Sequence, residues 1–275
     1  MLSGEPAPGS DRPAAIRTRG GGAGANVAAH LARQGTAVTL VGCIGDDAAG
    51  TGLAAELSAA GVELRLRTVP GAATGTIVSL VEPGGQRSML ADRGANLQLR
   101  PDDVPPPEAG QHLHLSGYTL LDPGPRGAGL AALAGAVEAG CTVSLDPAST
   151  GPLTGYGVDR WLADTALATV LLPNADEARL LTGCTDVADA ARALTARHRI
   201  VAVSLGADGA LWASGDVLVH RPAHATEVVD TTGAGDAFAA GLLAAWLPDQ
   251  RIDPADALDA GLACAAEIVR RPGAR

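Results

Sequence analysis

The sequence predicts an α/β protein whose mostly parallel β-sheet is covered by helices on both faces. Short apolar runs typical of strands alternate with Ala- and Leu-rich helical segments along most of the chain. Several runs, such as the one over 200–206, are almost continuously apolar, as strands buried on both faces are. The chain has 275 residues, of which 47% are hydrophobic. We therefore expect one large domain over 1–275.

The expected elements follow one another in a regular β/α rhythm. The first are a helix over 26–33, a strand over 37–44 and a helix over 50–60 that ends at Gly61. The later expected strands cover 112–117, 141–146, 169–173, 200–206 and parts of 210–229. The later expected helices cover 126–139, 186–197, 233–246 and 254–270.

Residues 62–92 interrupt this rhythm. They contain short alternating runs separated by Pro-Gly and Gly-Gly pairs, a pattern typical of hairpins. We expect them to form a small antiparallel sheet that projects from the main body.

The charge and composition exclude several classes of function. The net charge is −10, which disfavours nucleic-acid binding, and aromatic residues are only 2% of the chain. All 20 basic residues are arginines, so sites that depend on lysine, such as a GK[ST] phosphate loop or a Schiff base, are excluded. A bound phosphate must therefore be neutralised by backbone amides, arginine or a metal ion.

The cysteines and the apolar runs indicate a cytoplasmic protein that is not bound to a membrane. The four cysteines are widely scattered and show no spacing typical of metal ligands. We see no signal segment at the start, and the longest apolar runs, such as 237–247, are too short to span a bilayer.

The strongest motif is DTTGAGD over 230–236, which follows an expected strand ending in VVD and opens an apolar helix. Glycines at a helix start leave free backbone amides, which bind anions. Asp236 would lie beside the anion. Because a carboxylate repels phosphate there, its position suggests a proton acceptor. The alternative is a tight strand-to-helix turn with an ordinary first-turn acid.

A second glycine-rich segment, GGGAGAN over 20–26, also opens a helix. It matches GxGxxA, so a dinucleotide site of an NAD-dependent oxidoreductase is one alternative. That interpretation requires a preceding apolar strand, which AAIRTR is not. Asn26 would either orient a polyol hydroxyl or cap the helix.

Two further motifs lie at the expected carboxyl ends of strands, where ligands bind in open α/β sheets. In PNADE, Asn174 and Glu177 are three residues apart on one helix face and could hold Mg²⁺ through water. The alternative is a capping Asn with a first-turn Glu. SLGADG over 204–209 is a strand with a Gly-flanked turn, which by itself fits any hairpin.

The order of these motifs is similar to that of the ribokinase-like, phosphofructokinase-B-type carbohydrate kinases. GGAGAN, GAN at 94–96, SLDP, PNADE, SLGADG and DTTGAGD occur in the family's order from about residue 20 to the C-terminus. The resemblance implies a three-layer α/β/α fold with a β-sheet lid, which residues 62–92 would form. It also implies an ATP-dependent kinase that phosphorylates a hydroxymethyl group of a sugar or nucleoside.

The resemblance also implies roles for individual residues. Asp236 would be the catalytic base, and Gly233, Ala234 and Gly235 would form the anion hole. Asn174 and Glu177 would serve Mg²⁺ and phosphate. The nucleotide-side residues would be Ser204, Gly206, Gly209 and Thr232, and the sugar-side residues would be Gly21, Gly22, Asn26 and Asn96. Asp230, with Thr232, would be the place for the K⁺ that some relatives bind, and the lid would pair two copies into a homodimer.

The chain departs from the family pattern at its start. Family members usually begin with a core strand that ends near a substrate-binding Asp, and this strand has no counterpart here. Asp11, in a Gly- and Pro-rich segment, is a poor substitute. We expect a displaced start, because the later motifs are intact. The alternative is a catalytically compromised relative that binds nucleotide or sugar.

Four other side chains receive weaker predictions. His112 and His114 share one strand face and could form a metal pair, although structural histidines are the more common case. Arg87 and Arg93 in the lid segment could clamp an anionic sugar acid, although a solvated lid face is the more common arrangement.

Overall fold

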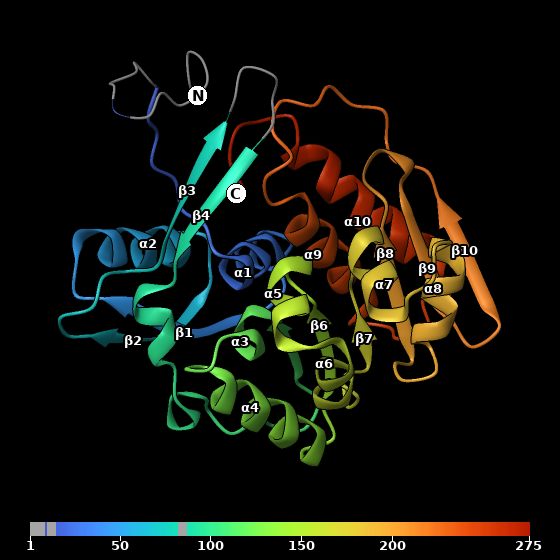
Figure 1. The fold of residues 1–275 in the computed structure, drawn as a ribbon, viewed down its shortest axis with the longest axis horizontal. Helices are drawn as coiled ribbons and strands as arrows, with labels where there is room; N and C mark the ends of the chain where they lie inside the picture. Colours follow the sequence, from blue (N-terminus) through green and yellow to red (C-terminus); the bar gives the residue numbers. More distant parts are fainter. Residues whose placement is uncertain (1–8, 10–14, 82–86) are drawn as a thin grey trace.

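A computed structural model describes residues 9, 15–81 and 87–275, apart from the side chains of residues 81 and 87. Asp11 and the side chain of Arg87 lie outside this part. Between residue 15 and the first helix, the described chain contains no strand. The described helices and strands follow the expected β/α order closely (Figure 1).

The first half of the chain contains α1 (Ala23–Arg33), β1 (Thr39–Gly45), α2 (Ala48–Ala59), β2 (Glu63–Val69), β3 (Thr76–Val81), β4 (Arg87–Asp92), β5 (His112–Ser116), α3 (Tyr118–Leu121) and α4 (Arg126–Glu138). Two short 3-10 helices, η1 (Gly94–Gln98) and η2 (Pro101–Asp103), join β4 to β5.

The second half contains β6 (Thr142–Asp146), α5 (Thr150–Tyr156), α6 (Val158–Asp164), β7 (Val170–Leu171), α7 (Ala175–Thr182), α8 (Val187–Leu194), β8 (Ile200–Ser204), η3 (Gly206–Asp208), β9 (Ala210–Ser214), β10 (Val217–Arg221), α9 (Ala234–Trp246) and α10 (Pro254–Ile268).

A six-stranded sheet in the order β10-β9-β8-β7-β6-β5 forms the centre of the molecule. β5 to β8 are parallel, whereas β9 and β10 are antiparallel. Because the parallel strands all end at one edge, residues that follow β6, β7 and β8 meet there. The mostly parallel sheet predicted from the sequence is confirmed.

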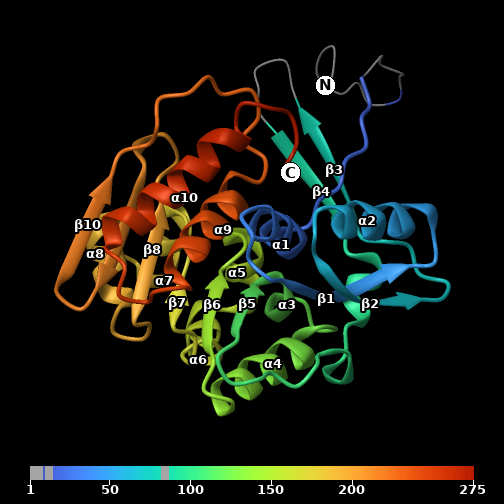
Figure 2. The same cartoon turned by 180° about the vertical axis from the view of Figure 1, so that it is seen from behind.

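Helices cover both faces of this sheet, which gives three layers. α3 to α8 pack on one face, and α1, α9 and α10 pack on the other (Figures 1 and 2). Each face has its own apolar cluster: Trp161 is fully buried in the first, and Trp212 and Trp246 are buried in the second. The strands between them are apolar on both sides, and Val201 and Val203 of β8 have no exposed surface.

The segment predicted as one small antiparallel sheet divides into two parts. β3 and β4 form the expected antiparallel pair, which rises above the body in Figure 1, and we call this pair the lid. β2 instead pairs in parallel with β1, in register from Thr39 with Glu63 to Gly45 with Val69. The prediction for β2 was therefore wrong, because alternation reveals a half-exposed strand but not the direction of its partner.

The expected strand before the DTTGAGD motif is absent. Val228 and Val229 are 59% and 55% exposed and belong to an irregular segment. The amide of Val229 donates to the carbonyl of Val269, just after α10, at 2.7 Å. The motif is thus held by the last helix rather than by a sheet. None of the described helices is long and apolar enough to cross a membrane.

Candidate active site

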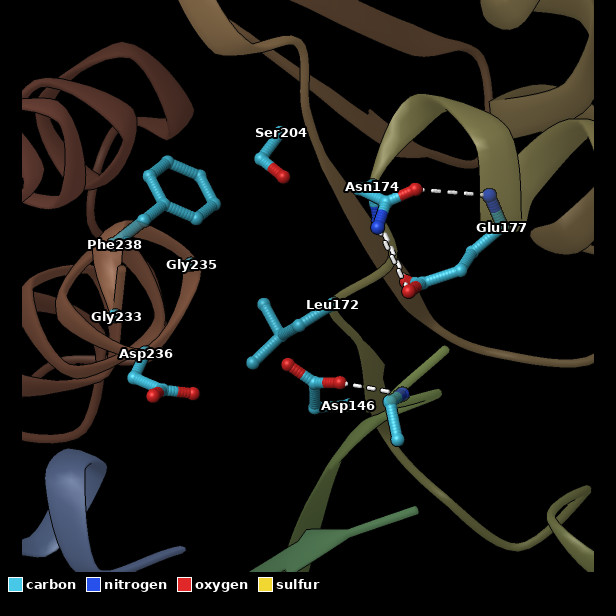
Figure 3. A pocket seen from close by; sticks show the side chains of 10 residues that line it. Asp146, Leu172, Asn174, Glu177, Ser204, Gly233, Gly235, Asp236 and Phe238 are labelled. Atoms are coloured by element: carbon cyan, nitrogen blue, oxygen red, sulfur yellow. Dashed lines mark hydrogen bonds between the residues drawn. The ribbon is translucent and has the colours of Figure 1, made fainter. Parts of the chain in front are cut away.

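A cavity of about 180 Å³ opens where β6, β7 and β8 end and α9 begins. Its position at the carboxyl edge of the parallel strands is the one predicted from the motifs. Figure 3 shows Asp236 facing Asp146, with the bonded pair of Asn174 and Glu177 beyond it. The cavity is lined by Asp146, Ala148, Leu172, Asn174, Glu177, Ser204, Gly233, Gly235, Asp236 and Phe238.

The start of α9 presents backbone amides without a capping side chain. Gly233 is the N-cap residue, and its φ of 77° lies in the left-handed region that favours glycine. A Cβ on Gly233 would lie 2.5 Å from the Cβ of Ala274, so the position also has no room for a side chain. Because the first amides of a helix have no intrahelical partners, this end of α9 can bind an anion.

Asp236 lies in the first turn of α9 and is bonded to α1. The Nδ2 of Asn26 donates to its Oδ2 at 2.7 Å, and Asn26 itself is 4% exposed. Burial raises the pKa of Asp236 to about 7, opposed by the Asn26 hydrogen bond. The charge of Asp146 adds to the rise in this pKa, and that of Arg275 reduces it. A carboxyl group with a pKa near 7 is suited to proton transfer.

Asn174 and Glu177 open α7 as a capping box. The Oδ1 of Asn174 accepts from the Glu177 amide at 2.9 Å, and the Oε2 of Glu177 accepts from the Asn174 amide at 2.9 Å. A third bond runs from Asn174 Nδ2 to Glu177 Oε1 at 2.7 Å. The pair therefore caps the helix, which confirms the capping interpretation, and both side chains also line the cavity.

Asp146 is a cavity residue that the sequence analysis did not assign. It ends β6, accepts a hydrogen bond from the Ala148 amide at 2.6 Å, and has its pKa raised to about 6 by burial. Ala148 is the only non-glycine residue with positive φ in the described chain, at 83°. Such strain is often retained at functional sites. The available signal was the SLDP run, whose Asp ends a buried strand at the same edge as Asn174.

The cavity has an excess of negative charge. Burial and then the charge of Asp146 raise the pKa of Glu177 to about 7. Among the described lining residues there is no basic side chain to compensate. Hard carboxylate and amide oxygens around a polar cavity fit Mg²⁺ held partly through water. Within the described chain, no three His, Cys, Asp or Glu side chains form a metal cluster.

Several predicted site residues lie outside the cavity wall. Ser204 lines it at the end of β8, but Gly206 and Gly209 lie in the following turn. Ala234 begins α9 without lining the cavity. The carboxylate of Asp230 accepts from the amides of Thr232 and Gly273 at 2.9 Å each, which closes a loop next to α9.

The predicted sugar-side residues divide similarly. Gly22 is the N-cap of α1, preceded by Gly21, and Asn26 reaches the cavity through its bond to Asp236. Asn96 is exposed at the base of the lid, with its Nδ2 against Gly75. It is therefore not part of the group around Asp236.

His112 and His114 are structural residues. His112 bonds to the hydroxyls of Thr142 and Ser144, and His114 bonds to the same Ser144, each at 2.8 Å. Burial lowers the pKa of His112 to about 3 and that of His114 to about 4, so both are neutral near pH 7. These bonds account for both side chains without a metal ion.

Comparison with known proteins decides the family. The chain matches the pfkB family carbohydrate kinases over residues 3–275. It belongs to this family. The expectation of a ribokinase-like kinase for a sugar or nucleoside is thereby confirmed, and the oxidoreductase alternative loses its basis.

Individual relatives of this pfkB family kinase agree in sequence and fold. The chain is 36% identical to an ATP-dependent ribose-1-phosphate kinase of Halopiger xanaduensis, over 98% of this chain and 87% of that protein. The structure of adenosine kinase from Sinorhizobium meliloti is similar with a TM-score of 0.87 and 26% identity, covering 93% of this chain and 79% of that one. The structure of aminoimidazole riboside kinase from Salmonella enterica was solved with aminoimidazole riboside and an ATP analogue. It is similar with a TM-score of 0.81 and 32% identity, covering 92% of this chain and 86% of that one.

Proposed function

We propose that this kinase transfers the γ-phosphoryl group of ATP to a hydroxymethyl group of a sugar or nucleoside, with Asp236 as the general base. The observation that carries the proposal is the position of Asp236: a partly buried carboxyl group, with a raised pKa, in the first turn of an uncapped helix that faces the cavity.

The reaction is a displacement at phosphorus. The acceptor hydroxyl gives its proton to the Asp236 carboxylate, and its oxygen forms a bond to the γ-phosphorus. The bond from that phosphorus to the β,γ-bridging oxygen breaks, and ADP leaves with the electron pair. Asn26 holds the Asp236 carboxylate in place through its 2.7 Å hydrogen bond.

The charge that develops on the transferring group would be met by the start of α9. Gly233 and Gly235 line the cavity, and with Ala234 between them they would form the proposed anion hole. Such a site needs no lysine, because phosphoryl transfer depends mainly on alignment and on stabilisation of charge. This agrees with a chain whose basic residues are all arginines.

Asn174, Glu177 and Asp146 are the residues that would hold Mg²⁺, largely through water. When bound, the ion would neutralise negative charge on the phosphates of ATP. We assign the nucleotide side to Ser204, Gly206, Gly209 and Thr232, and the acceptor side to Gly21, Gly22 and Asn26. Asn96 at the lid base is a weaker candidate. The loop closed by Asp230 is the proposed place for K⁺, supported by its contact with the α9 start through Thr232.

The lid is the proposed surface for a homodimer. Four of its apolar side chains are about half exposed: Ile77, Val78, Met89 and Leu90, at 51%, 50%, 55% and 59%. Large apolar side chains gathered on one two-stranded ribbon are typical of a protein interface. A second copy would cover them.

A coupled assay of ADP release over pentoses, hexoses, sugar acids, sugar phosphates and nucleosides tests the function. We expect release that depends on both an acceptor and Mg²⁺. Calorimetry that detects ATP binding without turnover on any acceptor would contradict the proposal and favour a relative that only binds its ligands.

A further inference from the structure

Arg275 is an unusual buried cation. Its side chain is only 2% exposed, and its Nε, Nη1 and Nη2 atoms have no hydrogen-bond acceptor among the described residues. Within the described residues, its one ionic contact runs from Nε to Glu56 Oε1 at 3.4 Å. A guanidinium carries five N–H donors, and buried donors without acceptors are costly. A native group of this kind requires an explanation, and an anion that binds there is one that satisfies its donors.

The guanidinium lies at the start of α1. Its Nη2 would be 2.0 Å from a Cβ on Gly20, two residues before the N-cap Gly22. His30 of α1 donates from Nε2 to the carbonyl of Ala274 at 2.9 Å, which holds the neighbouring backbone against this helix. Ala274 also contacts Gly233 at the start of α9. Arg275 thus follows directly a residue that contacts both the last turn of α1, through His30, and the start of α9.

Like α9, α1 begins without a capping side chain, and it has no acidic residue in its first turn. Its first amides therefore leave partial positive charge near the guanidinium. The charged groups that face Arg275 are Glu56 from α2, Arg33 from α1 and Asp236 from α9. The excess of positive charge on this side of Asp236 contrasts with the three carboxyl groups around the cavity.

We propose that Arg275 and the first amides of α1 form a subsite for a negatively charged group, phosphate or carboxylate, carried by the acceptor. The proposal rests on the proposed function, because it places the acceptor between α1 and Asp236. The Glu56 side chain, 45% exposed, can turn to solvent when the acceptor anion binds Arg275.

Arg93, directly after the lid, already has partners of its own. Arg93 pairs with Asp122 at 3.2 Å, and its guanidinium carbon lies 4.0 Å from the centre of the Tyr118 ring. An anion at Arg93 would have to displace both contacts, whereas Arg275 has donors to spare. The structure therefore favours Arg275 over Arg93 as the residue that selects an anionic acceptor.

The test compares acceptors with and without a charge. The ratio of kcat/KM for ribose 1-phosphate to that for ribose is measured for the wild type and for Arg275→Gln. The ratio of kcat/KM for gluconate to that for glucose is measured in the same way and tests a carboxylate in place of the phosphate. We expect a wild-type preference for one charged acceptor, and a fall in that ratio of about 10- to 100-fold in Arg275→Gln. Arg275→Lys should retain part of the wild-type ratio, because lysine keeps the positive charge but lacks the paired N–H donors of the guanidinium.

Arg271→Gln is the matched control. Arg271 is an exposed arginine four residues earlier that pairs with Glu267, and its loss should leave the ratio unchanged. Glu56→Gln should raise the affinity for the charged acceptor, because it removes the competing partner of Arg275. An unchanged ratio in Arg275→Gln, or a wild-type preference for the neutral acceptor in both arms, overturns the proposal.

Direct binding separates this inference from the proposed function. Calorimetry with ribose 1-phosphate and with gluconate measures the subsite even if no acceptor is phosphorylated. Binding that Arg275→Gln abolishes would support the subsite while the kinase assignment fails. Turnover on neutral acceptors alone, with no binding of either anion, would support the kinase and overturn the subsite.

Discussion

Two helices begin at the same cavity in opposite ways. α7 begins with three hydrogen bonds between Asn174 and Glu177, through which side chains satisfy the amides of these two residues. α9 begins at Gly233 without a capping side chain. The first arrangement fixes a carboxylate at the cavity, and the second leaves amides there for a ligand. The comparison agrees with the proposed function, in which one start would serve the cation and the other the anion of the same reaction.

The largest effect on activity should come from replacing the carboxylate at the uncapped start of α9. Asp236→Asn removes the proposed proton acceptor and keeps the shape, so kcat should fall about 10²- to 10⁴-fold. ATP affinity, measured by calorimetry, should change little. Turnover near the wild-type value would contradict the role given to Asp236.

Adding a side chain at the N-cap of α9 should have the next largest effect on activity. In Gly233→Ala the new Cβ would meet Ala274 at 2.5 Å and the backbone would be strained at φ 77°, so the helix start must shift. Displacement of the reacting groups by about 1 Å can cost about a hundredfold in kcat. Gly183→Ala is the control, because φ is 74° there with nothing within 4 Å of the Cβ. Only its melting temperature should fall; an equal loss of kcat in both variants would argue against the anion hole.

Replacing the carboxylate at the capped start of α7 should have a smaller effect, on the Mg²⁺ requirement. Glu177→Gln removes the charge while an amide oxygen can still accept from the Asn174 amide. The Mg²⁺ concentration for half-maximal activity should rise about tenfold. Asp176→Asn is the matched control: this neighbouring carboxylate is 81% exposed and pairs with Arg179. The same change in Mg²⁺ requirement in both variants would remove the metal role from Glu177.

The smallest effect concerns pH. Because the pKa of Asp236 is about 7 and its ionised form is the base, kcat/KM should rise with pH through about 7. Asn26→Ala removes the hydrogen bond that lowers this pKa, so the rise should move to higher pH. Gln34→Ala, an exposed amide at the end of the same helix, should leave the profile in place. A profile that moves to lower pH in Asn26→Ala would contradict this account of Asp236.

The sequence predicted the structure well wherever that structure depends on residues close together in the sequence. Glycine-flanked helix starts, apolar strands and the Asn-x-x-Glu spacing each depend on neighbours in sequence, and they predicted α1, α9 and the Asn174–Glu177 pair. The cavity followed from these, because parallel strands bring their ends to one edge. The hydrogen bond between Asn26 and Asp236, 210 residues apart, had no such signal, although both residues were assigned.

The predictions failed where a segment that is distant in the sequence decides the local structure. β2 has the alternation of a hairpin strand, but its neighbour is the parallel β1. Val228 and Val229 look like a strand in the sequence, but they lie in an irregular segment and the Val229 amide donates to the Val269 carbonyl. Asp146 and Arg275 each appear unremarkable in sequence, and only burial next to other charges distinguishes them.

The division of the tryptophans between the two apolar clusters gives the molecule two optical reporters. Trp161 of α6 packs in the cluster under α3 to α8, whereas Trp212 of the sheet strand β9 and Trp246 of α9 pack in the cluster under α1, α9 and α10. With one phenylalanine and two tyrosines in the whole chain, indole emission dominates the fluorescence. Replacing Trp161 with phenylalanine would leave emission from one layer alone, so stopped-flow unfolding can show whether the layers separate from the sheet together or in turn.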